Sequence, residues 1–214
     1  MGERRALADE LRKRGVDNVT QGRSGVDKRR LHPREGDLWR PKAVFLNVGR
    51  VALEKNLEAF LALDLPGTKV IVGDGPARRS LEQKYPDAVF LGALQGEALA
   101  EVYASADVFV FTGRTDTFGL VLLEALASGL PVAAFPVAGP RDVIGGAPVG
   151  CLQEDLREAC LAALSVPRKR CVEFAEQHSW EASARAFIDN MPRLAKAAVA
   201  PAPDRVPEPP RCAA

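Results

Sequence analysis

The stretch that decides the fold is residues 43–72, which read AVFLNVGRVALEKNLEAFLALDLPGTKVIV. It begins with an apolar run of strand length at residues 43–48, continues with a helix-like pattern at residues 56–63, and ends in a second apolar run at residues 69–72. Strands that are apolar throughout and alternate with helices are typical of a parallel sheet covered on both faces. This stretch therefore predicts a β-α-β unit of an α/β fold.

The same alternation continues along the chain. We expect further strands at residues 88–91, 108–111 and 131–134, and helices at residues 77–84, 97–104 and 120–127. The pattern predicts a Rossmann-like parallel sheet with helices on both faces.

After Gly146 the strand pattern fades, and the chain predicts only helices, at residues 153–164, 167–177 and 179–190. Ser179 is expected to cap the last of these. Trp180 and Phe187 are seven residues apart on one face of it, and we expect them to pack against the sheet domain. A short charged helix is expected at residues 2–14, and the proline-rich tail from residue 193 is expected to be disordered.

Composition excludes several classes of protein. Of 214 residues, 47% are hydrophobic and 27% charged, as in folded globular domains. The net charge of +1 argues against a nucleic-acid partner. Residues 1–42 form the one basic block, for which a solvated surface is favoured over a membrane or phosphate contact. The chain contains no apolar run of membrane-spanning length and begins without a signal-peptide pattern, so we expect a cytoplasmic location.

Four cysteines, Cys151, Cys160, Cys171 and Cys212, lack paired C-x-x-C spacing. With only two histidines in the chain, we expect no metal site and interpret the cysteines as free thiols. Cys160 lies in an apolar helical pattern and is expected to be buried.

Ligands of open parallel sheets bind at the carboxyl ends of the strands, so the loops there are the candidate site. The first loop, residues 49–56, contains Gly49, Arg50 and Lys55 before a helix. A helix amino terminus with two cations suits a diphosphate, although a solvent-exposed pair of cations is the alternative.

Glycines dominate the next two loops. Gly73 and Gly75 flank Asp74 in a turn that either faces a ligand or serves only to reverse the chain, and Gly92 follows the third strand.

The fourth loop, residues 114–120, is the most informative. Asp116 precedes the helix and Glu124 lies within it, about 12 Å away if the intervening residues are helical. Main-chain amides near Phe118, Gly119 and Leu120 would lie between these carboxylates and can donate hydrogen bonds to phosphate oxygens.

This segment resembles the E-x7-E element of the retaining glycosyltransferases of family four, which have the GT-B architecture. Further similarity, in the same order along the chain, is found at residues 48–50, 54–56, 73–76, 90–92 and 106–110. The resemblance extends over about residues 22–190. Asp116 replaces the commoner glutamate, so the resemblance does not indicate which sugar is transferred.

The resemblance implies a role for each matched residue. Arg50 and Lys55 would contact the donor diphosphate and stabilise the leaving group, Asp116 would face the sugar, and Glu124 would bind the ribose. The base would lie near Gly92 and the turn at residues 73–76. Main-chain contacts to the donor would come from Gly49, Phe118, Gly119 and Leu120.

By resemblance, residues 43–192 are a nucleotide-sugar-binding domain with carboxy-terminal helices, residues 1–42 a remnant helix with an interdomain connector, and residues 193–214 a tail. The implied reaction transfers a mannose- or glucose-like hexose from a nucleoside diphosphate sugar to a lipid, polysaccharide or other acceptor, with retention and without a further cofactor. A lipid acceptor would bring the chain to the inner face of the membrane.

The amino-terminal acceptor domain of the family is expected to be absent, so we expect this chain alone to bind nucleotide weakly and transfer little sugar. Three alternatives stay open: a non-catalytic nucleotide-sugar-binding module that works with a separate acceptor-domain subunit, an inactive truncated fragment, and a different nucleotide-binding fold.

Overall fold

A computed structural model describes residues 2–16, 19, 25–34, 38–39, 42–115 and 119–191. The predictions for Asp116, Phe118, Cys212, residues 22–24 and the tail at residues 193–214 fall outside these residues.

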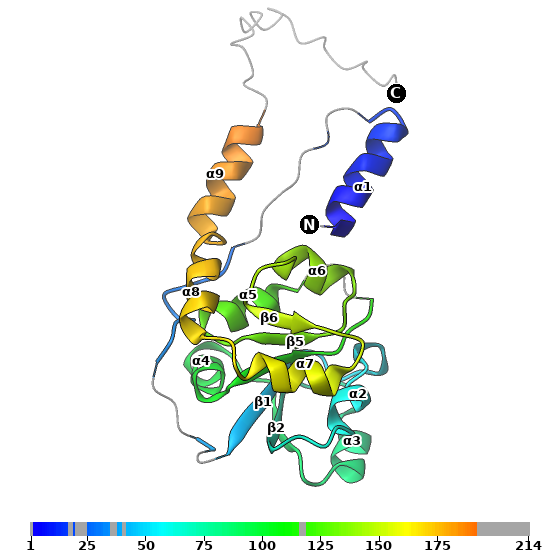
Figure 1. The fold of residues 1–214 in the computed structure, drawn as a ribbon, viewed down its shortest axis with the longest axis vertical. Coiled ribbons are helices and arrows are strands. Elements are labelled where there is room, and N and C mark those ends of the chain that lie inside the picture. Colours follow the sequence, from blue (N-terminus) through cyan, green and yellow to red (C-terminus); the bar gives the residue numbers. More distant parts are fainter. Residues whose placement is uncertain are drawn as a thin grey trace, which may run out of the picture.

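The core of the protein is a six-stranded sheet in the order β3-β2-β1-β4-β5-β6, with every adjacent pair parallel (Figure 1). The strands are β1 (Ala43–Val48), β2 (Gly67–Val72), β3 (Val89–Gly92), β4 (Val108–Phe111), β5 (Val132–Ala134) and β6 (Gly150–Leu152). From β1 the chain moves outward to β3, returns to β4 on the other side of β1, and continues to β6. The order of the strands therefore reverses between β1 and β4, where ligands bind in such sheets.

Alternate residues along each strand point to opposite faces, and each face has its own core. Leu46 and Phe109 belong to one core, whereas the adjacent Phe45 and Val108 belong to the other. The prediction of a sheet covered on both sides is confirmed.

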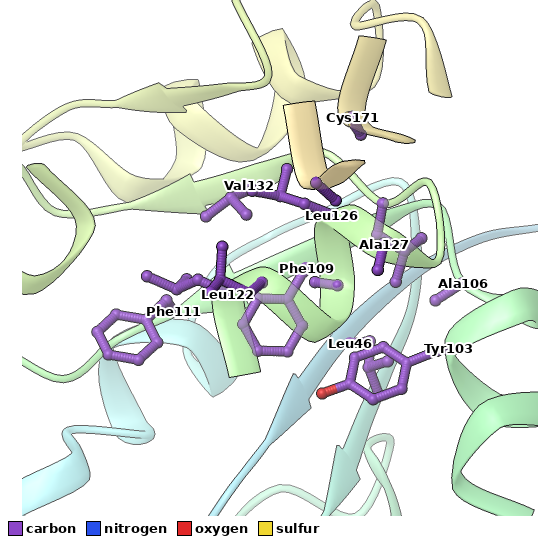
Figure 2. Close-up of a cluster of buried hydrophobic side chains, with 14 of the residues drawn as sticks. Leu46, Tyr103, Ala106, Phe109, Phe111, Leu122, Leu126, Ala127, Val132 and Cys171 are labelled. Atoms are coloured by element: carbon purple, nitrogen blue, oxygen red, sulfur yellow. The ribbon is translucent and has the colours of Figure 1, made fainter. Parts of the chain in front are cut away.

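The first face is covered by α4 (Gly96–Ser105), α5 (Leu120–Ala127), α6 (Ala138–Ile144) and α8 (Arg168–Glu176). The second face is covered by α2 (Glu58–Leu61), α3 (Arg78–Lys84) and α7 (Leu156–Ala163). Figure 2 shows the first core, in which the ring of Tyr103 from α4 lies beside Leu46 and Phe109.

The helix predicted at residues 56–63 is shorter than expected. The structure has a 3-10 turn, η1 (Leu53–Lys55), and then the four-residue α2. Between them Asn56 has φ +52°, a left-handed conformation that interrupts the helix.

Two elements were missed by the sequence prediction, α6 and β6. Gly139 and Pro140 obscure the helical pattern of α6, although proline is tolerated there because it lies in the first turn. The strand β6 has three residues and pairs only with β5, so it leaves almost no apolar run to detect.

The last helix, α9 (Trp180–Asn190), begins as predicted, because the Ser179 hydroxyl accepts a hydrogen bond from the main-chain N–H of Ala182. The expected packing of its aromatic face on the sheet domain is wrong. Trp180 and Phe187 are 55% and 66% exposed, since α9 follows α8 and projects beyond the sheet (Figure 1). The first helix, α1 (Gly2–Lys13), packs on α6.

Cys151, Cys160 and Cys171 are free, and burial raises the pKa of the fully buried Cys160 thiol to about 12. The predictions of free thiols at these positions and of a buried Cys160 are confirmed. Within the described ranges, no helix is both long and apolar enough to cross a membrane.

Candidate functional site

A cleft of ≈ 430 Å³ opens at the carboxyl ends of β1 and β4, at the point where the strand order reverses. It is lined from the β1 side by Asn47, Val48, Gly49, Arg50, Glu54 and Lys55, and from the β4 side by Phe111, Thr112, Gly113, Gly119, Leu120 and Val121. The cleft therefore brings the first and the fourth of the predicted loops together.

Residues 49–55, the cation loop, carry both predicted cations. The Arg50 side chain is 66% exposed, and one guanidinium nitrogen lies 3.7 Å from the Glu54 carboxylate. Lys55 closes η1 and is only partly exposed. Arg50 is therefore accessible to an anion rather than buried in an ion pair.

Main-chain hydrogen bonds join the cation loop to the two loops beyond it. The N–H of Gly49 donates to the carbonyl of Val72 (2.9 Å), and the N–H of Val51 donates to that of Asp74 (2.9 Å). Further out, the N–H of Gly73 donates to the carbonyl of Gly92 (2.7 Å). Main-chain hydrogen bonds therefore connect the three loops at the carboxyl ends of the strands.

Gly73 and Gly75 allow this contact. A Cβ atom on Gly73 would overlap the carbonyl oxygen of Gly49, and one on Gly75 would overlap that of Val51. Gly73 also has φ +139°, which favours glycine. Loop-to-loop contact thus accounts for both glycines without a ligand, and neither lines the cleft. Their role in donor binding stays a prediction.

The surroundings of Gly92 contain an arginine that sequence analysis missed. Arg78, on α3, lies against Gly92, where an added Cβ would be 2.9 Å from a guanidinium nitrogen. The same guanidinium pairs with Asp74 (3.2 Å) and Glu82 (2.8 Å). The predicted base region is therefore bordered by an ion-pair network.

Two polar residues, also missed, join β1 and the cation loop to β4. The buried Thr112 hydroxyl donates to the main-chain carbonyl of Lys55 (2.5 Å), and the Asn47 amide donates to the carbonyl of Val110 (2.8 Å). A polar residue within or directly after an apolar strand was the sequence signal that would have found both.

Arg114 fixes the chain that leaves β4, just before the undescribed Asp116. Its guanidinium lies 3.9 Å from the ring centroid of Phe135 and 3.4 Å from the Glu154 carboxylate. A cation over an aromatic face adds to the attraction between opposite charges.

The amino terminus of α5 forms the opposite side of the cleft. Gly119 precedes the helix, and a Cβ there would meet the Leu122 side chain at 2.7 Å. Gly119, Leu120 and Val121 line the cleft at this end. Unpaired amides and the helix dipole make the start of a helix favourable for anions. The cleft thus combines Arg50, Lys55 and a helix amino terminus.

Glu124 lies one turn further along α5. It is three residues from the cleft residue Val121, and residues at that spacing lie on the same side of a helix. One carboxylate oxygen, Oε2, accepts a hydrogen bond from the Tyr103 hydroxyl (3.0 Å). Burial raises the pKa of Glu124, and the hydrogen bond from Tyr103 opposes this rise.

A parallel sheet with a cleft at its switch point is the arrangement in which open α/β proteins bind their ligands. Residues 42–166 match the family described as Glycosyl transferases group 1. The chain belongs to this family.

Relatives extend over most of the chain. It is 40% identical to a GDP-mannose-dependent alpha-mannosyltransferase of Corynebacterium glutamicum over 167 residues, 72% of this chain and 40% of the relative. It is 30% identical to a GDP-mannose-dependent alpha-(1-6)-phosphatidylinositol dimannoside mannosyltransferase of Mycobacterium tuberculosis over 211 residues, 87% of this chain and 55% of the relative. The chain therefore spans about half or less of the length of these relatives.

Among solved structures, sucrose-phosphate synthase from Thermosynechococcus elongatus superimposes with a TM-score of 0.68 at 24% identity. The match covers 85% of this chain and 54% of that protein. It supports the Rossmann-like fold, one half of a GT-B architecture.

Proposed function

We propose that this chain is the donor-binding part of a hexosyltransferase that transfers mannose, or a similar hexose, from a nucleoside diphosphate sugar with retention of configuration. The cleft carries this proposal, because it places Arg50 and Lys55 opposite the amino terminus of α5 at the switch point of the sheet. The GDP-mannose dependence named for both relatives favours guanosine diphosphate as the nucleotide.

In this proposal the diphosphate lies between the cation loop and α5. As the bond from the sugar to the phosphate breaks, negative charge grows on the departing diphosphate. Arg50, Lys55 and the helix amides stabilise that charge, and cations fixed beforehand lower the barrier without a metal or other cofactor. The exposure of Arg50 at the open cleft leaves its guanidinium accessible to the incoming phosphates.

The remaining predicted roles belong to the same proposal. Asp116 would face the sugar, Phe118 and Gly119 would offer main-chain contacts, and Glu124 would hold the ribose. The base would lie toward Gly92. Residues 43–192 would form the donor domain, and residues 1–42 would be its connector.

A lipid acceptor is favoured over other acceptors, because one of the relatives is named for a phosphatidylinositol mannoside. We propose accordingly that the protein acts in the cytoplasm at the inner face of the membrane. The acceptor itself would be bound by residues outside the cleft described above.

Calorimetric titration of the 214-residue chain with GDP, UDP and ADP tests the proposal. GDP is expected to bind most tightly, and GDP-mannose to compete for the same site. Arg50→Ala should weaken binding, whereas Lys169→Ala, which removes a solvent-exposed cation of α8 that does not line the cleft, should not. Absence of heat with all three nucleotides, or equal binding by Arg50→Ala, would contradict the proposal.

A further inference from the structure

Tyr103 occupies an unusual place for a hydroxyl group. It lies on α4 with its side chain fully buried, and its ring is 6.1 Å from that of Phe109 between centroids. The rest of its surroundings in the first core are apolar, including Leu46 (Figure 2). Packing alone would be satisfied by a phenylalanine, which would bring no polar group into the core.

The hydroxyl has one recorded partner among the described residues, the Oε2 atom of Glu124 at 3.0 Å. A buried hydroxyl that lacks a partner costs free energy, so this bond fixes the hydroxyl and the carboxylate against each other. Tyr103 and Glu124 belong to different helices, α4 and α5, and the bond joins these two helices; the cleft residue Val121 is three residues before Glu124 on α5.

The bond also has a direction. Burial and the neighbouring Glu124 carboxylate raise the pKa of Tyr103 well above its ordinary value, so the hydroxyl keeps its proton and acts as the donor. The Glu124 carboxylate is the acceptor and uses Oε2 for it. Since a carboxylate has two oxygens with several acceptor positions, Oε1 is left for another donor.

Among the described residues, the bond from Tyr103 is the hydrogen bond found for the Glu124 carboxylate. Neighbouring residues of α5, Leu123, Ala125 and Leu126, are buried and apolar and provide no side-chain donor. Tyr103 therefore selects one orientation of the carboxylate before any ligand arrives, and preorganised groups bind with a smaller entropic cost.

We propose that Tyr103 is a positioning residue of the donor site, which holds Glu124 through Oε2 so that Oε1 accepts a hydrogen bond from a ribose hydroxyl of the nucleotide. This inference rests on the proposed function, which assigns the ribose to Glu124. It goes beyond that assignment, because a residue buried in the core would determine how the ribose is held.

The test compares two ligands, GDP and 2′,3′-dideoxy-GDP, on the wild-type chain and on Tyr103→Phe. The variant should bind GDP roughly tenfold more weakly, the size expected for a hydrogen bond to a charged group. It should bind the dideoxy nucleotide as the wild type does. The ratio of the two dissociation constants is the readout, since a partly unfolded sample weakens both equally and leaves the ratio unchanged.

Phe109→Leu is the matched control, because it disturbs the packing of Tyr103 and keeps the hydroxyl. It should change both dissociation constants by the same factor. Tyr103→Leu provides a second variant without the hydroxyl and should show the same altered ratio as Tyr103→Phe. An unchanged ratio in both Tyr103 variants would overturn the inference.

Glu124→Ala separates this inference from the proposed function. If Glu124→Ala binds GDP as well as the wild type does, the assignment of the ribose to Glu124 is wrong. If Glu124→Ala loses affinity for GDP but not for the dideoxy nucleotide, while the ratio of Tyr103→Phe is unchanged, the ribose assignment stands and only the role of Tyr103 falls.

Discussion

On the β1 side of the cleft, the cation loop is joined to its neighbours by main-chain hydrogen bonds, whereas on the α5 side the recorded hydrogen bond of the Glu124 carboxylate comes from Tyr103. Arg50 remains largely in solvent, so its charge needs no compensation from the protein. Glu124 is partly buried, and burial raises its pKa, so its charge needs a donor. The comparison indicates that the backbone is enough to position an exposed charged side chain, whereas a buried one also needs a hydrogen bond from another side chain.

The largest expected effect comes from breaking the main-chain contact on the β1 side. Gly73→Ala forces a Cβ onto the carbonyl oxygen of Gly49 at a φ of +139°, and we expect a loss of about 3 kcal/mol or more in the free energy of unfolding. Urea denaturation measures it. Gly49→Ala is the control, because Gly49 also has a positive φ, +157°, but a Cβ there meets no atom within 4 Å, so only backbone strain of about 1 kcal/mol is expected. Similar losses for both would show that loop contact is not what selects glycine at residue 73.

The second largest effect is expected from removing a cation of the cation loop itself, rather than the contacts that hold the loop. Lys55→Ala is expected to weaken GDP binding about tenfold or more and to lower the free energy of unfolding by a smaller amount. Raising the salt concentration should reduce the difference from the wild type, because salt screens the attraction between the lysine and the diphosphate in an open cleft. Lys169→Ala, which removes an exposed cation of α8, should bind GDP normally. A loss of stability as large as the loss of affinity would mean that Lys55 has mainly a structural role.

The third effect tests whether side chains also support the cation loop. Thr112→Val keeps the shape of the buried side chain and removes its hydrogen bond to the carbonyl of Lys55. We expect a loss of about 1 kcal/mol in stability and a smaller loss in GDP affinity. Thr68→Val, on a partly exposed position of β2 remote from the cleft, is the comparison. If Thr112→Val changed neither stability nor GDP affinity, the main-chain hydrogen bonds alone would be enough to hold the cation loop.

The smallest effect is a gain in stability. Because burial raises the pKa of Glu124, the folded protein binds this proton more tightly than the unfolded chain does. The contribution of this group to stability is therefore greatest below the unfolded pKa and is lost as the pH rises through the folded pKa. Glu124→Gln should raise the free energy of unfolding at pH 8 by about 0.5 kcal/mol, which appears as a slightly higher melting temperature. This gain should vanish toward pH 3. A gain that is the same at both pH values would contradict the electrostatic cause.

Regular elements with strong apolar patterns could be predicted from the sequence, and the elements that depend on contacts could not. The bounds of β1, β4 and α5 were predicted correctly because nearly all of their residues are apolar and most are buried. The helix at residues 56–63 was predicted too long, since a single left-handed residue, Asn56, divides it. The exposure of Trp180 could not be predicted, because the helical pattern shows which residues share a face but not what covers that face.

The site shows the same division. Arg50 and Lys55 are recognisable because glycine and cations follow a strand, and the structure brings them to the cleft with Gly119. Tyr103 and Thr112 are separated from their partners by 21 and 57 residues, so their hydrogen bonds exist only in the folded protein. A polar residue directly after an apolar strand marks Thr112 as a candidate, but no local pattern shows its partner, and none marks Tyr103.

The projection of α9 has a spectroscopic consequence. The chain contains two tryptophans, of which Trp180 is 55% exposed on α9 while Trp39 packs against the first core. A soluble quencher such as acrylamide should therefore reach Trp180 more readily than Trp39. Any molecule that covers this helix would shift the emission of Trp180 to shorter wavelengths. The protein thus carries a built-in optical reporter for α9 that needs no added label.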